Sequence, residues 1–305
     1  METPAVAAGE KLGVVDGRPS PLSKMVVPVF DRSVRYGLGV FETVGVHAGR
    51  PFLLGQHARR LVQGLGRLGL ASSLDPRTLV RWGQRAVELA SVQEGVLRIL
   101  ATAGDDGALR PRVLAWAMEE PPTVSEASER GLRASIHPLR RDPASPLSGT
   151  KSLAYADCYL ARWQANARGF DEAILCSSEG RIAEGTASNV FIVEGSRLVT
   201  PPLSEGILPG VTRAFILEIA RGVSLEPMEE PIEMARLMRS REAFLTSTRL
   251  GVAPLVAVED KMIAEGRPGP VTLTLRRSYG GIARGEYPGS GATPGCRPER
   301  GMEIP

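Results

Sequence analysis

Lysine is scarce in this sequence of 305 residues. Only four of the 37 basic residues are lysine, and the other 33 are arginine. The four are Lys11, Lys24, Lys151 and Lys261. Arginine cannot supply a nucleophilic amine, because its pKa lies above about 12. Each lysine is therefore a candidate for amine chemistry, and the competing explanation is a bias toward arginine in which a few lysines remain by chance.

Long apolar runs, paired cysteines and a large net charge are also missing. The longest apolar runs, such as residues 25–30, are far too short to span a bilayer. Residues 1–13 do not have the pattern of a secretory signal. Cys158, Cys176 and Cys296 are odd in number and lack metal-like spacing, and a net charge of +3 is too small to indicate nucleic-acid binding. We expect a reduced, cytoplasmic protein without a metal, a membrane span or a nucleic-acid partner.

The composition is that of an ordinary globular protein, with 43% hydrophobic and 23% charged residues. The length suggests two domains or one large one, and a polar, proline-rich stretch separates two patterned regions. We expect a small N-terminal domain over residues 1–120, a connection over 121–134 and a larger domain over 135–288. Residues 289–305 cannot bury an apolar face, which predicts a disordered tail.

Apolar periodicity predicts a mixture of helices and strands. Asp75 followed by Pro76 is typical of a helix start. We expect helices over residues 53–70, 75–89, 152–169, 211–222 and 270–284. We expect strands over residues 95–104, 112–118, 132–139, 172–176, 181–185, 189–201, 243–248 and 252–258.

One lysine has the companions that pyridoxal 5'-phosphate (PLP) requires. That cofactor is held as a Schiff base on a lysine amine, with a carboxylate beside its pyridine nitrogen. Its phosphate requires arginine, hydroxyls and backbone amides, preferably at the N-terminus of a helix. Lys151 follows a loop rich in hydroxyls, and we expect it to open a helix.

Three later segments complete this set. Residues 184–189, EGTASN, place a carboxylate between two short strands. Residues 207–213, ILPGVTR, lead a loop into a helix, and residues 246–248, TST, end a strand with three hydroxyls. Taken singly, a surface carboxylate or a helix cap is the simpler explanation of each. The argument depends on their occurring together.

In order and spacing, these segments resemble the class IV (fold-type IV) PLP-dependent aminotransferases. That family includes branched-chain amino acid aminotransferases, D-amino acid aminotransferases and aminodeoxychorismate lyases. The resemblance covers about residues 26 to 285. It includes a Y-G-x-G-x-F-E-T stretch and an H-x-x-R-L helix within residues 31–61, the E-G-x-x-x-N block at 184–189 and the L-P-G-x-T-R block at 208–213. It implies a small α/β N-terminal domain, and a larger C-terminal domain whose mixed, barrel-like sheet is flanked by helices.

The resemblance implies roles for individual residues. Lys151 is the Schiff-base lysine and the general acid and base, and Glu184 is the partner of the pyridine nitrogen. Arg60, three residues after His57, corresponds to the arginine that binds the cofactor phosphate. The adjacent Arg59 is the alternative if the alignment is shifted by one residue.

Other cofactor contacts follow from the same resemblance. Val211 and Thr212 offer an amide and a hydroxyl to the phosphate, joined by the hydroxyl residues Ser247 and Thr248. Tyr155 is expected to hydrogen-bond the ring hydroxyl of the cofactor.

The resemblance also implies contacts to the substrate. Tyr36 and Phe41 match positions that line the family's pocket, although a core role is the alternative for Phe41. Arg98 aligns with a basic position near the substrate carboxylate in some branches. D-amino acid enzymes carry an arginine in a T-R-G stretch where this chain has Ala103, which counts against that branch. The stretch 36–43, YGLGVFET, also differs from the Y-G-x-x-V-F-E-G of branched-chain enzymes.

The leading hypothesis is a transaminase that moves an amino group between a branched-chain-like or related small amino acid and a 2-oxo acid. The alternative in the same fold is an aminodeoxychorismate lyase, which forms 4-aminobenzoate and pyruvate. A non-catalytic PLP-binding homologue is the alternative from a different class. The resemblance also implies a homodimer or a higher homo-oligomer.

Overall fold

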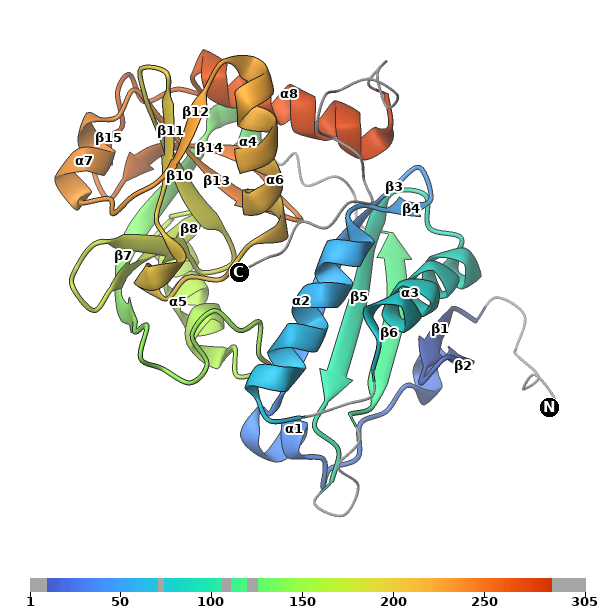
Figure 1. Cartoon of the computed structure of the whole chain (residues 1–305). Helices are drawn as coiled ribbons and strands as arrows, with labels where there is room; N and C mark the ends of the chain where they lie inside the picture. Colours follow the sequence, from blue (N-terminus) through green and yellow to red (C-terminus); the bar gives the residue numbers. More distant parts are fainter. Residues whose placement is uncertain (1–9, 71–73, 106–110, 120–125, 287–305) are drawn as a thin grey trace. The chain divides into compact units, whose positions relative to one another are not determined.

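A computed structural model describes residues 10–70, 74–105, 111–119 and 126–286 (Figure 1), and these form two compact units. Unit 1 contains the described residues up to 119 together with Thr150–Tyr155, and unit 2 contains residues 126–149 and 156–286. Lys151 is thus part of unit 1, whereas the expected division placed it in the C-terminal domain. The expected tail at 289–305 lies outside the described residues.

Unit 1 is built on a six-stranded sheet in which all neighbouring strands are antiparallel. The strand order is β2 (Arg18–Pro21), β1 (Leu12–Val15), β6 (Val113–Glu119), β5 (Gly95–Thr102), β3 (Gly39–His47) and β4 (Arg50–Pro51). The 3-10 helix η1 (Leu22–Lys24) and the short helix α1 (Arg32–Tyr36) lie between β2 and β3 in the chain.

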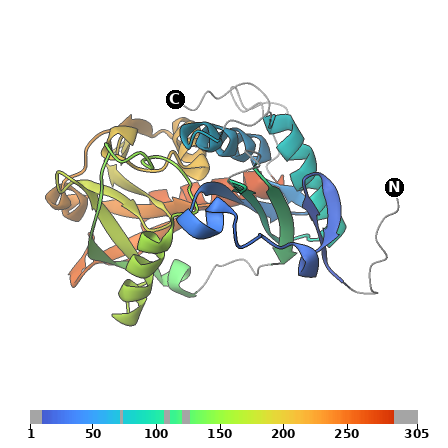
Figure 2. The same ribbon diagram turned by 90° about the horizontal axis from the view of Figure 1, so that it is seen from below.

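Two amphipathic helices, α2 (Leu54–Arg67) and α3 (Pro76–Ala90), pack on the same face of this sheet (Figures 1 and 2). Leu61 and Leu65 form a fully buried stripe on α2. Helix α3 begins as expected, because the Asp75 carboxylate accepts a hydrogen bond from the Arg77 amide. Side chains alternate along a strand, so only every second residue of β3, β5 and β6 faces these helices.

Unit 2 contains a nine-stranded mixed sheet. Its order is β12 (Glu226–Glu229), β11 (Arg197–Thr200), β10 (Asn189–Glu194), β13 (Glu242–Ser247), β14 (Gly251–Val258), β7 (Leu132–Arg141), β8 (Glu172–Ser177) and β9 (Ile182–Gly185), with β15 (Lys261–Met262) beside β14. Strand β9 also pairs with β10 through Glu184 and Asn189, which closes six strands into a ring. Because β7 is parallel to both of its neighbours, the expected mixed, barrel-like sheet is confirmed.

Helices flank this ring. Helix α5 (Ala156–Ala167) packs on β7 and β8, whereas α6 (Val211–Ala220) and α8 (Pro270–Arg284) pack beside β13 (Figure 1). Four short helices complete unit 2: α4 (Glu126–Arg130), η2 (Leu203–Glu205), η3 (Arg221–Val223) and α7 (Met234–Arg239). Within the described ranges, no helix is long and apolar enough to cross a membrane.

The structure corrects two local expectations. The helix expected over 152–169 begins only at Ala156, because the chain before it pairs with β3. The Lys151 carbonyl accepts a hydrogen bond from the Phe41 amide, and the Leu153 amide donates to Gly39. The prediction that Lys151 opens a helix is therefore wrong. The strand expected over 189–201 is a hairpin of β10 and β11, which turns at Gly195 with φ of 64°.

Candidate active site

The amine of Lys151 lies against two aromatic rings of unit 1. Its Nζ atom is 4.6 Å from the ring centroid of Phe41 and 5.8 Å from that of Tyr155. These two rings contact each other edge to face, with centroids 5.5 Å apart. Such rings attract an ammonium group through their faces. The backbone bond to β3 and the two rings thus fix where the amine lies.

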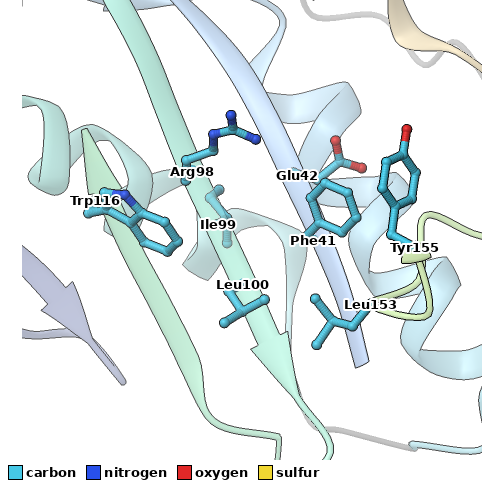
Figure 3. A pocket seen from close by; sticks show the side chains of 8 residues that line it. All are labelled: Phe41, Glu42, Arg98, Ile99, Leu100, Trp116, Leu153 and Tyr155. Atoms are coloured by element: carbon cyan, nitrogen blue, oxygen red, sulfur yellow. The ribbon is translucent and has the colours of Figure 1, made fainter. Parts of the chain in front are cut away.

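Phe41 and Tyr155 also line a pocket of about 230 Å³ (Figure 3). Its lining residues are Phe41, Glu42, Arg98, Ile99, Leu100, Trp116, Leu153 and Tyr155. The volume is below the range of roughly 300 to 1,000 Å³ that is usual for ligand pockets. Most of the lining is apolar or aromatic, so the pocket suits the side chain of a small metabolite.

The strand register explains why the pocket lies on the sheet face opposite α2 and α3. Phe41 pairs with Leu100, and Arg98 pairs with both Thr43 and Trp116. Directly paired residues point to the same side of a sheet. The Arg98 Nη1 atom donates a 2.6 Å hydrogen bond to the Thr43 hydroxyl, which holds the guanidinium group over β3.

Tyr36, the third residue predicted to contact substrate, is not part of this lining. It ends α1 with 59% of its surface exposed. Its hydroxyl accepts a 2.6 Å hydrogen bond from Arg35 Nη2, and the Arg35 guanidinium lies 4.8 Å from its ring centroid. Its role as a substrate contact stays a prediction.

A buried charge cluster lies beneath the pocket, on the opposite face of β3. The Glu42 carboxylate accepts hydrogen bonds from Arg60 Nε at 2.7 Å and Arg60 Nη2 at 2.6 Å. It also bonds His57 Nδ1 at 2.7 Å. His57 and Arg60 are three residues apart on α2 and therefore share one face of the helix. Arg60 is buried and bound to Glu42, whereas the adjacent Arg59 is only partly buried.

The protonation states in this cluster follow from burial and charge. Burial opposes ionisation of Glu42, but the charges and hydrogen bonds of Arg60 and His57 outweigh it and lower its pKa to about 2. Burial lowers the pKa of His57 as well, against the attraction of Glu42. At neutral pH, Glu42 is therefore ionised and paired with Arg60.

Glu42 was not among the residues predicted from the sequence. A signal was present: Val40, Glu42 and Val44 alternate on the face that packs under α2, so a carboxylate occupies a core position of the strand. A carboxylate in such a position requires a buried cationic partner. The nearby H-x-x-R pattern of His57 and Arg60 supplies it.

In unit 2, the Glu184 side chain is only 5% exposed, and two partners hold its carboxylate. Arg141 Nε lies 2.7 Å from one carboxylate oxygen, and the Leu208 amide donates a 3.0 Å hydrogen bond to the other. Arg141, near the end of β7, was not predicted. Its positive charge favours the ionised form of Glu184, which is the form that a protonated pyridine nitrogen requires as a partner.

The turn that follows Glu184 is fixed by a second buried carboxylate. Glu172, which is fully buried at the start of β8, accepts hydrogen bonds from the Thr186 amide, the Thr186 hydroxyl and the Ser188 hydroxyl. Arg162 forms an ion pair with it at 3.1 Å. Glu172 thus holds the turn of the EGTASN segment in place.

Asn189 connects the Glu184 strand to the N-terminus of α6. Its side-chain amide donates a 3.0 Å hydrogen bond to the Leu208 carbonyl. A Cβ atom at Gly210 would lie 2.0 Å from Asn189 Oδ1, so this approach requires glycine. Gly210 caps α6 without a side-chain hydrogen bond. The first residues of the helix, Val211 and Thr212, carry the amides that favour an anion there.

Hydroxyl groups gather near this helix start. Tyr279 on α8 hydrogen-bonds Thr212, and burial raises the pKa of Tyr279 to about 12. The Thr246 hydroxyl is buried and has no hydrogen-bond partner among the described residues. Thr246 pairs with Asn189 across β10 and β13, which places the two side chains on one face. Ser247, at the end of β13, accepts from the Leu250 amide at 3.1 Å, and Thr248 begins the following turn.

Each unit provides groups that suit a part of PLP. A helix N-terminus with nearby hydroxyls favours a phosphate, and unit 2 provides both together with an orphaned hydroxyl at Thr246. A carboxylate favours a protonated pyridine nitrogen, and Glu184 is a carboxylate that a cation holds in place. An imine requires an amine, and Lys151 places one against a pocket in unit 1.

Comparisons with known proteins agree with this reading. Residues 39–258 match the family model described as amino-transferase class IV. The chain is 31% identical over 260 residues to a putative branched-chain-amino-acid aminotransferase of Methanocaldococcus jannaschii, covering 83% of this chain and 90% of that protein. It is also 31% identical over 274 residues to the aminodeoxychorismate lyase of Bacillus subtilis, covering 87% and 92%.

A solved structure shows the same fold. The branched-chain aminotransferase of Thermoproteus uzoniensis, solved with norvaline, superposes with a TM-score of 0.84 at 27% identity, covering 91% of this chain and 96% of that one. Other solved enzymes of this fold contain pyridoxamine 5'-phosphate or a phosphopyridoxyl adduct of glutamate. The prediction of a fold-type IV enzyme is thereby confirmed. Since the family match spans most of its length, the chain belongs to the class IV aminotransferases, which are PLP-dependent enzymes.

Proposed function

We propose that this enzyme moves the amino group of a small, branched-chain-like amino acid to PLP, and from there to a 2-oxo acid. The observation that carries the proposal is the pocket of about 230 Å³, which is mainly apolar and is bordered by the two rings that hold the Lys151 amine. An amino acid with an aliphatic side chain is the substrate class that fits such a lining. Branched-chain activity in the names of relatives supports the same class.

When bound, PLP supplies an electron sink that makes the substrate Cα–H bond acidic. We assign to Lys151 Nζ both the covalent attachment of the cofactor and the transfer of that proton, because a neutral amine serves as nucleophile and as base. Tyr155 is assigned a hydrogen bond to the ring hydroxyl. Arg60 is assigned the phosphate, with Glu42 holding its guanidinium in place.

Unit 2 supplies further contacts in this proposal. Glu184, whose carboxylate lies 2.7 Å from Arg141 Nε, would accept a hydrogen bond from the protonated pyridine nitrogen. At the start of α6, the Val211 amide and the Thr212 hydroxyl would donate hydrogen bonds to the phosphate. We assign the hydroxyl groups of Ser247 and Thr248 as further hydrogen-bond donors to the same phosphate.

For the substrate, Phe41 supplies an apolar wall and Arg98 a cation at the pocket. Tyr36 is assigned a substrate contact from the family resemblance. We also propose that the enzyme is a cytoplasmic homodimer. Sedimentation equilibrium is expected to give about twice the chain mass of 32.6 kDa, and a species of one chain mass at micromolar concentration would contradict the dimer.

A half-reaction screen tests the proposed function. The PLP form is mixed with individual L- and D-amino acids, and loss of the visible absorbance of the lysine-bound cofactor is followed by stopped flow. Leucine, valine or a similar small L-amino acid is expected to convert the cofactor to its amine form. If no amino donor converts the cofactor to its amine form, the transaminase proposal is overturned.

Aminodeoxychorismate lyase is the second candidate, because the B. subtilis relative with 31% identity carries that activity. The same preparation is therefore assayed for release of 4-aminobenzoate from aminodeoxychorismate. Formation of 4-aminobenzoate without conversion by any amino donor would establish the lyase instead. Absence of both reactions in a protein that binds PLP would favour a non-catalytic homologue.

A further inference from the structure

Trp116 closes the pocket at the end farthest from Lys151. The lysine amine lies over Phe41 on β3, whereas Trp116 is on β6, with β5 between them. Two strand spacings of about 4.8 Å separate β3 from β6 by about 10 Å. Figure 3 shows Trp116 at one side of the pocket and Phe41 with Tyr155 at the other.

Trp116 is the residue of β6 whose side chain lines this pocket. Ala115 and Ala117, on either side of Trp116, are buried on the opposite face under the helices. Strand β6 contributes one residue to the pocket lining, and that residue is Trp116. The floor between the two ends comes from Arg98 and Leu100 on β5.

The position of the Arg98 side chain determines how much of the pocket is open to a substrate side chain. Its guanidinium group bonds Thr43 on β3 at 2.6 Å, so it is drawn away from β6. Trp116 is its direct neighbour on the other strand. A side chain that crosses the pocket from the Lys151 end therefore reaches the indole ring, which is what β6 contributes to the lining.

We propose that Trp116 is a specificity-determining residue, whose indole ring sets the longest apolar side chain that the pocket accepts. The proposal rests on the proposed function, since it requires the substrate side chain to occupy this pocket. The substrate class that follows is amino acids with short aliphatic side chains. Longer chains and large aromatic rings are excluded by the indole wall.

The test compares Trp116→Ala and Trp116→Phe with the wild-type holoenzyme. Met118→Ala is the matched control, because Met118 lies two residues along the same strand, is exposed and does not line the pocket. The substrates are straight-chain 2-amino acids from four to eight carbons. The rate of cofactor conversion gives kcat/KM for each, and calorimetry gives Kd for the matching unreactive carboxylic acids.

In wild type, affinity is expected to rise with each added methylene and then fall once the chain reaches Trp116. Trp116→Ala is expected to move this maximum by at least one methylene and to raise kcat/KM for longer substrates about 10-fold or more, mainly through KM, since one methylene changes discrimination by 10- to 200-fold. Trp116→Phe should give a smaller change in the same direction. Met118→Ala should keep the wild-type profile.

A chain-length profile that stays unchanged in both Trp116 variants would overturn the inference while leaving the transaminase intact. An equal change in Met118→Ala would overturn it as well, because the effect would then not be specific to the wall. If wild type converts no amino acid at all, the proposed function fails and this inference fails with it. PLP content and circular dichroism establish that each variant is folded, and Trp116→Phe keeps the test valid if the alanine variant does not fold.

Discussion

Replacement of Arg60 by methionine is predicted to destabilise the protein severely, because it leaves the Glu42 charge buried without its main partner. Glu42 is fully buried, and Arg60 binds both of its oxygens. Removing one member of a buried ion pair costs about 3 to 5 kcal/mol. The pKa of Glu42 gives a similar figure. A carboxyl group with an ordinary value of 4.5 and a folded value of about 2 contributes about 3 kcal/mol at neutral pH.

The assay is urea unfolding of the cofactor-free protein, followed by circular dichroism at pH 7. We expect Arg60→Met to lower the free energy of unfolding by about 3 kcal/mol or more. Arg59→Met is the matched control on the same helix and should cost less than about 1 kcal/mol, as partly exposed charges do. Equal losses in both variants would refute the assignment of Arg60 as the partner of Glu42.

The same cluster predicts a pH dependence. Because the pKa of Glu42 is lowered in the folded state, its contribution is fully present above pH 4.5 and is lost as the pH falls toward 2. The difference in stability between wild type and Glu42→Gln should therefore shrink between pH 5 and pH 2. A difference that stays constant over this range would contradict the pKa assignment.

Two further predictions concern unit 2. Gly210→Ala should lower stability by about 1 to 3 kcal/mol, because its Cβ atom would meet Asn189 Oδ1 at 2.0 Å and displace the bond to Leu208; thermal unfolding measures this, and an unchanged Tm would contradict the close approach. Thr212→Val should raise the Kd for PLP about 10-fold or more, since a hydrogen bond to a charged group contributes about 1.5 to 3 kcal/mol. Thr212→Ser keeps the hydroxyl and should bind PLP as wild type does; equal weakening in both variants would refute the hydroxyl contact.

Local sequence patterns predicted those helices that are determined by residues close to one another in the sequence. The stripe of Leu61 and Leu65 and the Asp75 cap define α2 and α3 closely. The ring of unit 2 was implied only by the family resemblance. Its closure depends on β9 pairing with β10 through Glu184 and Asn189, a contact that no periodicity reveals.

The start of α5 shows the opposite case, in which a non-local contact overrides a local pattern. The residue types after Lys151 favour a helix, yet the backbone of Lys151 and Leu153 forms hydrogen bonds with Gly39 and Phe41 on β3. A strand more than 100 residues earlier thus decides the conformation around the lysine. Sequence periodicity cannot detect such pairing, because it describes only neighbours along the chain.

The candidate site divides in the same way. Lys151, Glu184 and Thr212 stand in recognisable sequence blocks, so their roles could be predicted. The residues that hold Glu184 and its neighbours in place could not be predicted, because Arg141 and Glu172 act through contacts with segments that are distant in the sequence. These partners hold the Glu184 carboxylate and the turn that follows it in place.

Borohydride reduction followed by peptide mapping tests the central claim most directly. Reduction fixes PLP covalently to the lysine that carries it, and the chain offers four lysines, of which Lys151 places its amine against a ring of the pocket. We predict that the label is found on Lys151 alone, and that Lys151→Arg shows neither label nor visible absorbance. A label on another lysine, or a Lys151→Arg variant that still forms the coloured adduct, would contradict the account.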